Sequence, residues 1–185
     1  LEEQAQAIFK EWFVDNAKSE WKVGKLEEIA DVLMGQSPDG KTYNEEGNGK
    51  VFFQGRAEFG NRFPTVRLYT TEPKRIAPRN SVLLSVRAPV GDINVALDEC
   101  CIGRGLASIC AKGDFQSFSL YTMFNAQASL DIYNGEGTIF GCVNKDALNN
   151  LAVIIPPVDE IMKFENVARE IDAKILENTK ESQTL

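Results

Sequence analysis

The spacing of apolar residues divides the chain into two helical ends and a mixed middle. Near the C-terminus, residues recur at alternating spacings of three and four, which is typical of a coiled-coil seam. This seam consists of Ile161, Phe164, Ala168, Ile171, Ile175, Asn178, Ser182 and Leu185. It begins after Pro156-Pro157 and two acidic residues, a pattern that favours a helix start. Asn178 on the seam is the kind of polar residue that fixes register.

The N-terminal end has the same periodicity, with Leu1, Ala5, Ile8 and Trp12 on one stripe. We therefore expect a long helix at each end of the chain. A narrow apolar seam is stable only when a second helix or a globular body covers it. Both coverings remain open from the sequence, and the regularity of the seam favours an antiparallel pair of helices.

Between these ends, short apolar runs alternate with Gly, Pro and Asn, which predicts strands and turns. The strand candidates are 51–53, 66–69, 82–86, 93–97, 107–110, 138–140 and 151–155. Residues 26–33 and 117–128 are predicted as helices, as is a short segment capped by Asn144. Residues 35–49 form a polar loop. The expected fold class is therefore α+β, a mixed globule flanked by two long helices.

Charge is unevenly distributed along the sequence. The whole chain has a net charge of −7, but residues 50–112 contain ten basic and five acidic side chains. Seven of the eight arginines lie in this middle third. A local basic patch, more than the net charge, determines whether phosphate is bound. A solvated face of mixed charge explains the same count.

Other chemistry is poorly supported. There is no histidine, and the four cysteines are Cys100, Cys101, Cys110 and Cys142, without any C-x-x-C pair. We therefore expect no metal site and reduced thiols in a cytoplasmic protein. The glycines at 135, 137 and 141 do not have the spacing of a nucleotide-binding loop, so no cofactor is expected. No apolar run is long enough to span a membrane, and no signal peptide is visible.

Several motifs together resemble one family. Residues 82–91 read Val-Leu-Leu-Ser-Val-Arg-Ala-Pro-Val-Gly, and residues 101–107 read Cys-Ile-Gly-Arg-Gly-Leu-Ala. Gly135-Glu-Gly-Thr-Ile-Phe-Gly141 follows, and Pro156-Pro157 then precedes the long helix. This order resembles the target recognition domain of type I restriction-modification specificity subunits. The segment from Gln4 to Asp15 is similar to the end of that family's central spacer helix.

The resemblance implies a domain layout and a set of partners. Residues 1–16 would end the central spacer helix, residues 17–156 would form the DNA target recognition domain, and residues 157–185 would begin the C-terminal coiled-coil helix. The spacer contacts are expected from Ile8, Trp12, Ile161, Phe164, Ile171, Ile175 and Asn178. The chain would be non-catalytic and would read one half of a split double-stranded DNA target. Methyltransferase subunits would methylate adenine using S-adenosylmethionine, and restriction subunits would join through the complex.

Side-chain chemistry selects the candidate DNA contacts, because Gln can read adenine, Arg can read guanine, and aromatic groups add stacking area. The candidates are Gln36, Ser37, Lys41, Tyr43, Gln54, Arg56, Phe59, Arg62, Arg67, Tyr69, Arg87, Arg104 and Thr138. Each has a structural alternative. Arg87 could pair with Asp92 to hold its turn, and Gly103-Arg104-Gly105 could be a tight bend between strands. The loop residues could be ordinary surface polarity.

Two other functions remain open. The domain could be the recognition module of a single-chain restriction-methyltransferase, or a coiled-coil assembly protein that does not bind DNA. Because the chain starts without Met and contains one recognition domain, we expect a fragment. Either a second recognition domain precedes it, which the N-terminal segment favours, or two copies dimerise to read a palindrome.

Overall fold

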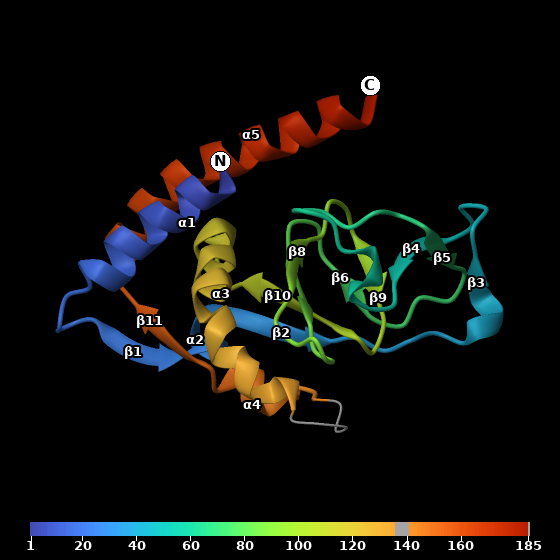
Figure 1. Cartoon of the computed structure of the whole chain (residues 1–185), viewed down its shortest axis with the longest axis horizontal. Coiled ribbons are helices and arrows are strands. Elements are labelled where there is room, and N and C mark those ends of the chain that lie inside the picture. The colour runs from blue at the N-terminus through green and yellow to red at the C-terminus, as the bar shows by residue number, and fades with distance from the viewer. Residues whose placement is uncertain (136–140, 185) are drawn as a thin grey trace.

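The computed structural model describes residues 1–135 and 141–184. Three helices lie at one end of the molecule, a four-stranded sheet lies in the middle, and a five-stranded sheet lies at the other end (Figure 1). This arrangement confirms the α+β fold class with flanking helices. No helix of the described residues is long and apolar enough to cross a membrane.

The three helices pack through aromatic side chains. They are α1 (Glu2–Lys10, continued by a π-helical turn over Glu11–Asp15), α3 (Gln116–Leu130) and α5 (Val158–Thr184). The Phe164 ring of α5 lies 5.4 Å from that of Phe9 and 5.3 Å from that of Phe13, between centroids. The N-terminal end of α1 lies farther along α5, so the two helices are antiparallel (Figure 1). Helix α3 is buried around most of its circumference because α1 and α5 cover one side and the sheet covers the other.

The four-stranded sheet separates two apolar cores. Its order is β2 (Ala30–Met34), β10 (Leu106–Ala111), β7 (Val82–Ser85) and β8 (Ile93–Val95), with every pair antiparallel. Successive side chains of a strand point to opposite faces. Val82 and Leu84 therefore enter the larger core beneath the helices, whereas Leu83 enters the smaller core.

The smaller core also lies against the five-stranded sheet. That sheet contains β3 (Tyr43–Asn44), β5 (Leu68–Thr70), β4 (Lys50–Phe53), β9 (Cys100–Ile102) and β6 (Ile76–Ala77), in this order. Strands β4 and β9 are parallel, and the other pairs are antiparallel. Phe53 and Ile102 fill this core.

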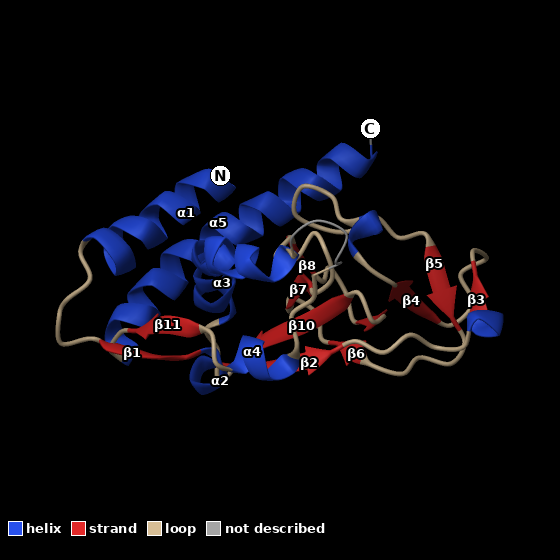
Figure 2. Cartoon of the chain, turned by 60° about the horizontal axis from the view of Figure 1, so that its bottom comes forward, coloured by secondary structure: helices blue, strands red, loops and turns tan. Residues whose placement is uncertain are grey.

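Short elements complete the fold (Figure 2). Strands β1 (Lys22–Lys25) and β11 (Ala152–Ile155) form an antiparallel ribbon below the helices. Helix α2 spans Leu26–Ile29 and helix α4 spans Lys145–Asn149. Three 3-10 turns cover Gly40–Thr42, Arg56–Glu58 and Asp131–Asn134. The Asn144 side chain accepts a hydrogen bond from the Ala147 amide, which confirms the predicted cap.

Two parts of the secondary-structure prediction were wrong. Residues 26–33 are not one helix, because α2 ends at Ile29 and β2 begins at Ala30. Edge pairing with β10 outweighs the local helical pattern there. Strands β3, β6 and β9 were missed because they have only two or three residues and no usable periodicity. The predicted strand 138–140 lies outside the described residues.

The C-terminal seam has two different environments. Ile161, Phe164 and Ala168 are buried against the other helices of the same chain. Farther along α5, Ile171 and Ile175 are only half-buried and Asn178 is exposed. On α1, Ile8 and Trp12 pack at the margin of the core, and the Trp12 ring lies 6.1 Å from that of Phe164. The first part of the seam is therefore covered by the chain's own globule.

Candidate nucleic-acid interface

Four chain segments meet where three glycines allow their backbones to touch. A Cβ added at Gly35 would lie 2.0 Å from the carbonyl oxygen of Gly103. A Cβ at Gly103 would lie 2.9 Å from Cα of Gln54, and one at Gly105 would lie 2.8 Å from the Gln54 oxygen. Real side chains do not fit at such distances, so only glycine permits this approach. We name residues 35–37, 54–56, 86–88 and 103–105 the glycine junction.

Backbone hydrogen bonds hold the junction together. The Gly35 amide donates to Leu106 O at 2.9 Å, and the Gly103 amide donates to Phe53 O at 2.8 Å. The Gly105 amide donates to Gln54 O at 3.1 Å, and the Arg104 amide donates to Ser37 Oγ at 3.2 Å. Since the backbone makes these contacts, the Gln36, Gln54 and Arg104 side chains remain exposed.

Arg87 joins the junction through the turn that follows β7. The Val86 amide donates to Gly105 O at 2.9 Å, and Arg87 forms an isolated bridge with Cys142. Ser85 Oγ donates to Pro89 O at 2.8 Å and accepts from the Asp92 amide at 2.9 Å, which fixes the turn. The Arg87 side chain is exposed, and neither it nor Arg104 forms an ion pair within residues 1–135 and 141–184.

The acid in this region pairs with a different arginine from the expected one. The Asp92 carboxylate pairs with Nε of Arg56 instead of with Arg87. The alternative in which Asp92 holds Arg87 is therefore wrong, and the Arg87 side chain has no ion-pair partner within residues 1–135 and 141–184. Both members of the Arg56–Asp92 pair are partly exposed, at 46% and 38% of their side chains. An exposed pair of this kind adds little stability and can exchange for a phosphate.

Several other candidates lie away from the junction. Tyr43 and Tyr69 are half-buried on β3 and β5, and Lys41 is exposed in the preceding 3-10 turn. The Tyr43 hydroxyl donates to Pro38 O at 3.0 Å. Arg67 is exposed and pairs with the buried Glu58 at 2.9 Å. Tyr43 and Tyr69 therefore lie on the five-stranded sheet, whereas Lys41 and Arg67 lie just before strands β3 and β5.

Two candidates are turned toward the interior, Phe59 partly buried and Arg62 almost completely buried. Phe59 packs against the smaller core. Arg62 is 7% exposed and pairs with Glu2 and Asp172 of the helices, so its guanidinium is directed away from the surface of the junction. Thr138 lies outside the described residues.

Arg75 was not among the predicted DNA contacts, and it lies beside Gly103 of the junction. Its carbonyl oxygen accepts a hydrogen bond from the Ile102 amide at 2.9 Å, directly before Gly103. The Arg75 side chain is exposed. Its place depends on the two-residue strand β6, and so brief an apolar pair gives no signal in the sequence.

Cys100 and Cys101 are buried in β9. Burial raises the pKa of the Cys100 thiol to about 12, so this thiol is protonated at neutral pH. Among the described residues, no group of three or more Cys, Asp or Glu side chains is placed to hold a metal ion. Cys142 is exposed beside Arg87.

The fold is an α+β domain flanked by helices. Its glycine junction presents cationic and amide side chains at the surface. A model of the type I restriction modification DNA specificity domain matches residues 18–184. The chain therefore belongs to this family of DNA specificity domains.

Known relatives agree with this assignment. The putative type I restriction enzyme MjaX specificity subunit of Methanocaldococcus jannaschii is 36% identical over 180 residues, covering 96% of this chain and 42% of that subunit. The HsdS subunit of Thermoanaerobacter tengcongensis is 34% identical with a TM-score of 0.74, covering 97% of this chain and 45% of that one. A third similar chain comes from a structure concerned with complex assembly and conformational transition of the type I R-M system. It is 32% identical with a TM-score of 0.75, covering 98% of this chain and 47% of that one. This chain thus spans less than half the length of each of these relatives.

Proposed function

We propose that this chain reads one half of a split double-stranded DNA target through the glycine junction. In this proposal, residues 17–156 form the recognition domain, and residues 1–16 and 157–185 belong to a helical spacer. Methyltransferase and restriction subunits of a cytoplasmic complex would perform the chemistry. The family assignment supports a role in DNA specificity, and the structure supports the location of the reading surface.

One observation carries the proposal. The junction collects exposed Gln36, Gln54, Arg87 and Arg104 from four segments that are distant in the sequence. These side chains have the chemistry that base edges require, because Gln can bind adenine with two hydrogen bonds and Arg can bind guanine with two. Their positions are set by backbone contacts, which keeps the side chains free for a ligand.

The arginines of the junction differ in whether their side chains already have an ion-pair partner, and we assign their roles accordingly. We assign Arg87 and Arg104 to guanine or phosphate, since neither is paired within the described residues. Arg56 must leave Asp92 before it can bind DNA, so we assign it a smaller contribution. Arg75 is added as a flanking phosphate contact. Lys41, Tyr43, Arg67 and Tyr69 would lie at the periphery.

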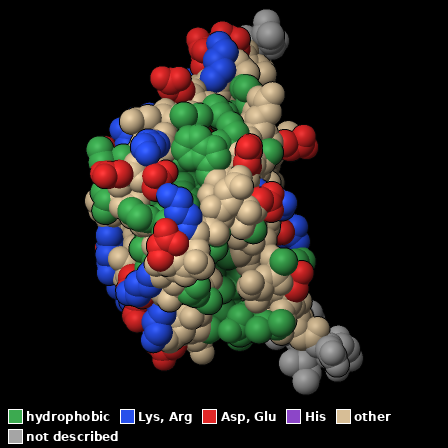
Figure 3. Space-filling view, turned by 90° about the vertical axis from the view of Figure 1, so that its left-hand side faces the viewer, with side chains coloured by type: hydrophobic (Ala, Val, Ile, Leu, Met, Phe, Trp, Pro, Cys, Tyr) green, Lys and Arg blue, Asp and Glu red, His purple; other side chains and the backbone are tan. Residues whose placement is uncertain are grey.

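Helices α1, α3 and α5, which we name the helical end, support the spacer part of the proposal. The half-buried Ile171 and Ile175 and the exposed Asn178 continue a seam that the described helices do not cover. Figure 3 shows the end where α1 finishes and α5 begins, with hydrophobic side chains gathered between charged ones. Val14, Val23, Val158 and Met162 are exposed in this part of the chain, with Val23 70% exposed. We propose this face as a contact for a methyltransferase subunit.

The first test measures binding to duplex DNA. A randomised duplex library is selected on the purified chain, and the selected sequence is titrated at about 50 mM and about 200 mM salt. We expect tighter binding to the selected sequence than to a scrambled one, and weaker binding at the higher salt because neutralised phosphates release counterions. Equal binding of scrambled DNA with no salt dependence would exclude the proposal.

Charge reversal separates DNA reading from a role in assembly. The variant Arg87→Glu with Arg104→Glu should lose binding to the selected duplex and keep its far-UV circular dichroism. The control Lys163→Glu changes an exposed cation on α5 and should bind normally. If the double variant still binds DNA, the junction is not the reading surface.

The cellular test addresses the complex. The chain, extended to its native ends, is expressed with the methyltransferase subunit encoded beside it, and adenine methylation is sequenced. A split methylated motif whose one half changes when residues 36–70 are exchanged supports the half-site assignment. A stable complex without methylation would favour the alternative of a coiled-coil assembly protein that does not bind DNA.

A further inference from the structure

A buried ion-pair network connects the recognition domain to the helices. It starts in the loop Gly60–Phe63, between the 3-10 turn that begins at Arg56 and strand β5. The Gly60 amide donates to Asn94 Oδ1 at 3.0 Å, and Asn94 Nδ2 donates to Gly60 O at 2.9 Å. The Val95 amide donates to Arg62 O at 2.9 Å. The backbone of this loop is therefore fixed to β8.

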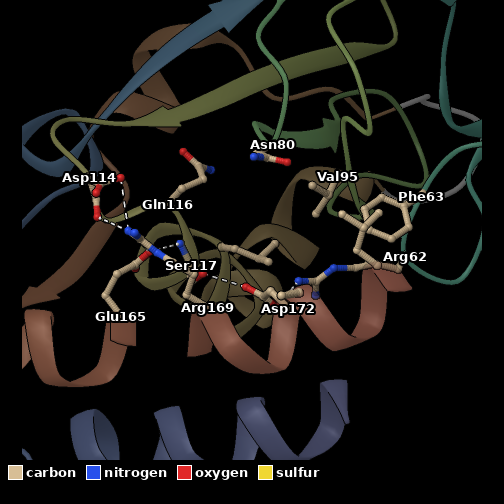
Figure 4. A pocket seen from close by; sticks show the side chains of 13 residues that line it. Arg62, Phe63, Asn80, Val95, Asp114, Gln116, Ser117, Glu165, Arg169 and Asp172 are labelled. Atoms are coloured by element: carbon tan, nitrogen blue, oxygen red, sulfur yellow. Dashed lines mark hydrogen bonds and ion pairs between the residues drawn. The ribbon is translucent and has the colours of Figure 1, made fainter. Parts of the chain in front are cut away.

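The Arg62 side chain extends from that loop to two helices. Its Nη1 lies 2.7 Å from Glu2 Oε2 on α1, and its Nη2 lies 2.5 Å from Asp172 Oδ1 on α5. Figure 4 shows the pocket lined by Arg62, Ser117, Glu165 and Asp172, with the Arg62 side chain pointing toward Asp172 on α5. Arg62 is one of the few charged side chains that are almost completely buried.

Asp172 extends the network to the third helix. It accepts a hydrogen bond from Ser117 Oγ at 2.7 Å and one from the Tyr121 hydroxyl at 2.6 Å, both on α3. The Arg62 guanidinium also lies 5.7 Å from the centre of the Tyr121 ring. Burial alone would lower the pKa of Arg62, but Asp172, Tyr121 and Glu2 raise it overall. The cation is therefore retained within a network that joins four elements.

A second contact sets the place of α5 on α3. Helix α3 starts at Gln116 without a side-chain cap of its own. The buried Glu165 of α5 accepts hydrogen bonds from the Ser117 amide at 3.2 Å and the Phe118 amide at 2.8 Å. This contact fixes α5 to α3 but does not reach the loop at Arg62. The Arg62 pairs are what tie that loop to both outer helices.

The chemistry of Arg62 is better suited to fixing geometry than to adding stability. Burying ion pairs costs desolvation energy, so such pairs are weak evidence for stability. Nε of Arg62 is moreover buried without a hydrogen-bond partner. The planar guanidinium holds two carboxylates in a fixed relation, which a lysine ammonium does not reproduce.

We propose that Arg62 is a positioning residue that fixes the orientation of the glycine junction relative to α1 and α5. Arg62 and Arg56 lie six residues apart, so one segment has a DNA-facing end and a helix-facing end. The consequence for DNA rests on the proposed function. If the helices set the distance between half-sites, the Arg62 network sets the angle from which this half-site is read.

Distances between spin labels test the orientation directly. Cys110 and Cys142 are replaced by serine, and labels are attached at Glu99→Cys beside the five-stranded sheet and Asn178→Cys on α5. The unchanged network should give one narrow distance distribution. Arg62→Lys keeps the charge but cannot bridge both carboxylates, and it should widen the distribution about twofold. The matched control Arg67→Lys alters an exposed arginine and should leave the width unchanged.

A milder variant keeps the test decisive if Arg62→Lys does not fold. Glu2→Gln removes the charge of one carboxylate of the network but keeps an acceptor oxygen, so it should widen the distribution less and in the same direction. A folded Arg62→Lys or Glu2→Gln protein with the original narrow distribution would overturn the proposal. Melting followed by circular dichroism establishes that each variant is folded.

Binding to the selected half-site duplex distinguishes this proposal from the proposed function. The Arg62→Lys chain should bind that duplex within about twofold of the unchanged chain, because its junction is intact. A failure of Arg87 and Arg104 variants to alter binding would refute the DNA-reading function and leave the distance result standing. A normal DNA result with an unchanged distance distribution would refute only the positioning role.

Discussion

The helical end and the glycine junction use their residues in opposite ways. At the helical end, large side chains fill the space between the elements, and Arg62 forms ion pairs with Glu2 and Asp172. At the junction, the backbones touch and the side chains of Gln36, Gln54, Arg87 and Arg104 project outward. Side chains that stabilise the helical packing are unavailable to a ligand, whereas backbone contacts at the junction leave the polar side chains available. Four predictions separate these two designs, from the largest expected effect to the smallest.

Removing the central aromatic ring of the helical end should have the largest effect. Phe164 is 1% exposed and contacts the rings of both α1 and α3. Phe164→Ala should lower the free energy of unfolding by about 3–5 kcal/mol because it leaves a cavity. Urea denaturation measures the loss. Met162→Ala, two residues away and 49% exposed, should change it by less than about 1 kcal/mol. Similar losses for both variants would contradict the packing described.

The junction should be sensitive to a single methyl group. Gly35→Ala would place Cβ against the backbone of Gly103, where no flexible side chain can move aside. We expect a loss of about 2–3 kcal/mol in the free energy of unfolding. Gly40→Ala is the matched control, since a Cβ at Gly40 meets nothing within 4 Å. If Gly35→Ala is as stable as Gly40→Ala, the backbones are farther apart than described.

The outward side chains should affect binding more than stability. Arg104→Gln should weaken binding to the selected duplex by about tenfold, since one Arg–guanine contact contributes about 1–3 kcal/mol. The free energy of unfolding should stay within about 0.5 kcal/mol because the side chain is exposed. Fluorescence anisotropy and urea denaturation give the two values. A loss of stability comparable to that of Gly35→Ala would assign Arg104 to the fold.

The two regions also differ in how far the sequence could predict them. Ile161, Phe164 and Ala168 repeat at helical spacing, so the sequence correctly indicated a buried helix face. The glycine junction depends on contacts between segments that are far apart in the sequence, and no local pattern reports such contacts. Arg62 is an example of a residue whose burial no local sequence pattern predicts. Its residue type suits DNA, but its burial depends on packing against Asp172 of α5, which lies 110 residues away in the sequence.

Exposure of the candidate side chains could be predicted only in part, for the same physical reason. Arg87 and Arg104 were selected for their chemistry, and both are exposed because they lie in turns, which place side chains at the surface. The position of Arg75 beside Gly103 could not be predicted, because its neighbours form a strand of only two residues. Pairing of Asp92 with Arg56 instead of Arg87 could not be foreseen, because both arginines lie within reach along different segments. Residue chemistry selected candidates, and only the fold decided which of them have free side chains.

The smallest predicted effect concerns the pH dependence of the smaller core. Burial raises the pKa of Cys100 from 9.0 to about 12, so the folded state holds this thiol protonated where the unfolded chain ionises it. Stability should therefore fall as the pH rises above the ordinary thiol value, by about 1 kcal/mol between about pH 9 and about pH 10 from this residue. Urea denaturation at both pH values should show a shallower decline in Cys100→Ala than in the unchanged chain. Cys142→Ala is the control, since this exposed residue lies at the junction, and it should leave the decline unchanged. An equal decline in all three proteins would mean that the Cys100 thiol does not contribute, and that the smaller core admits water to β9.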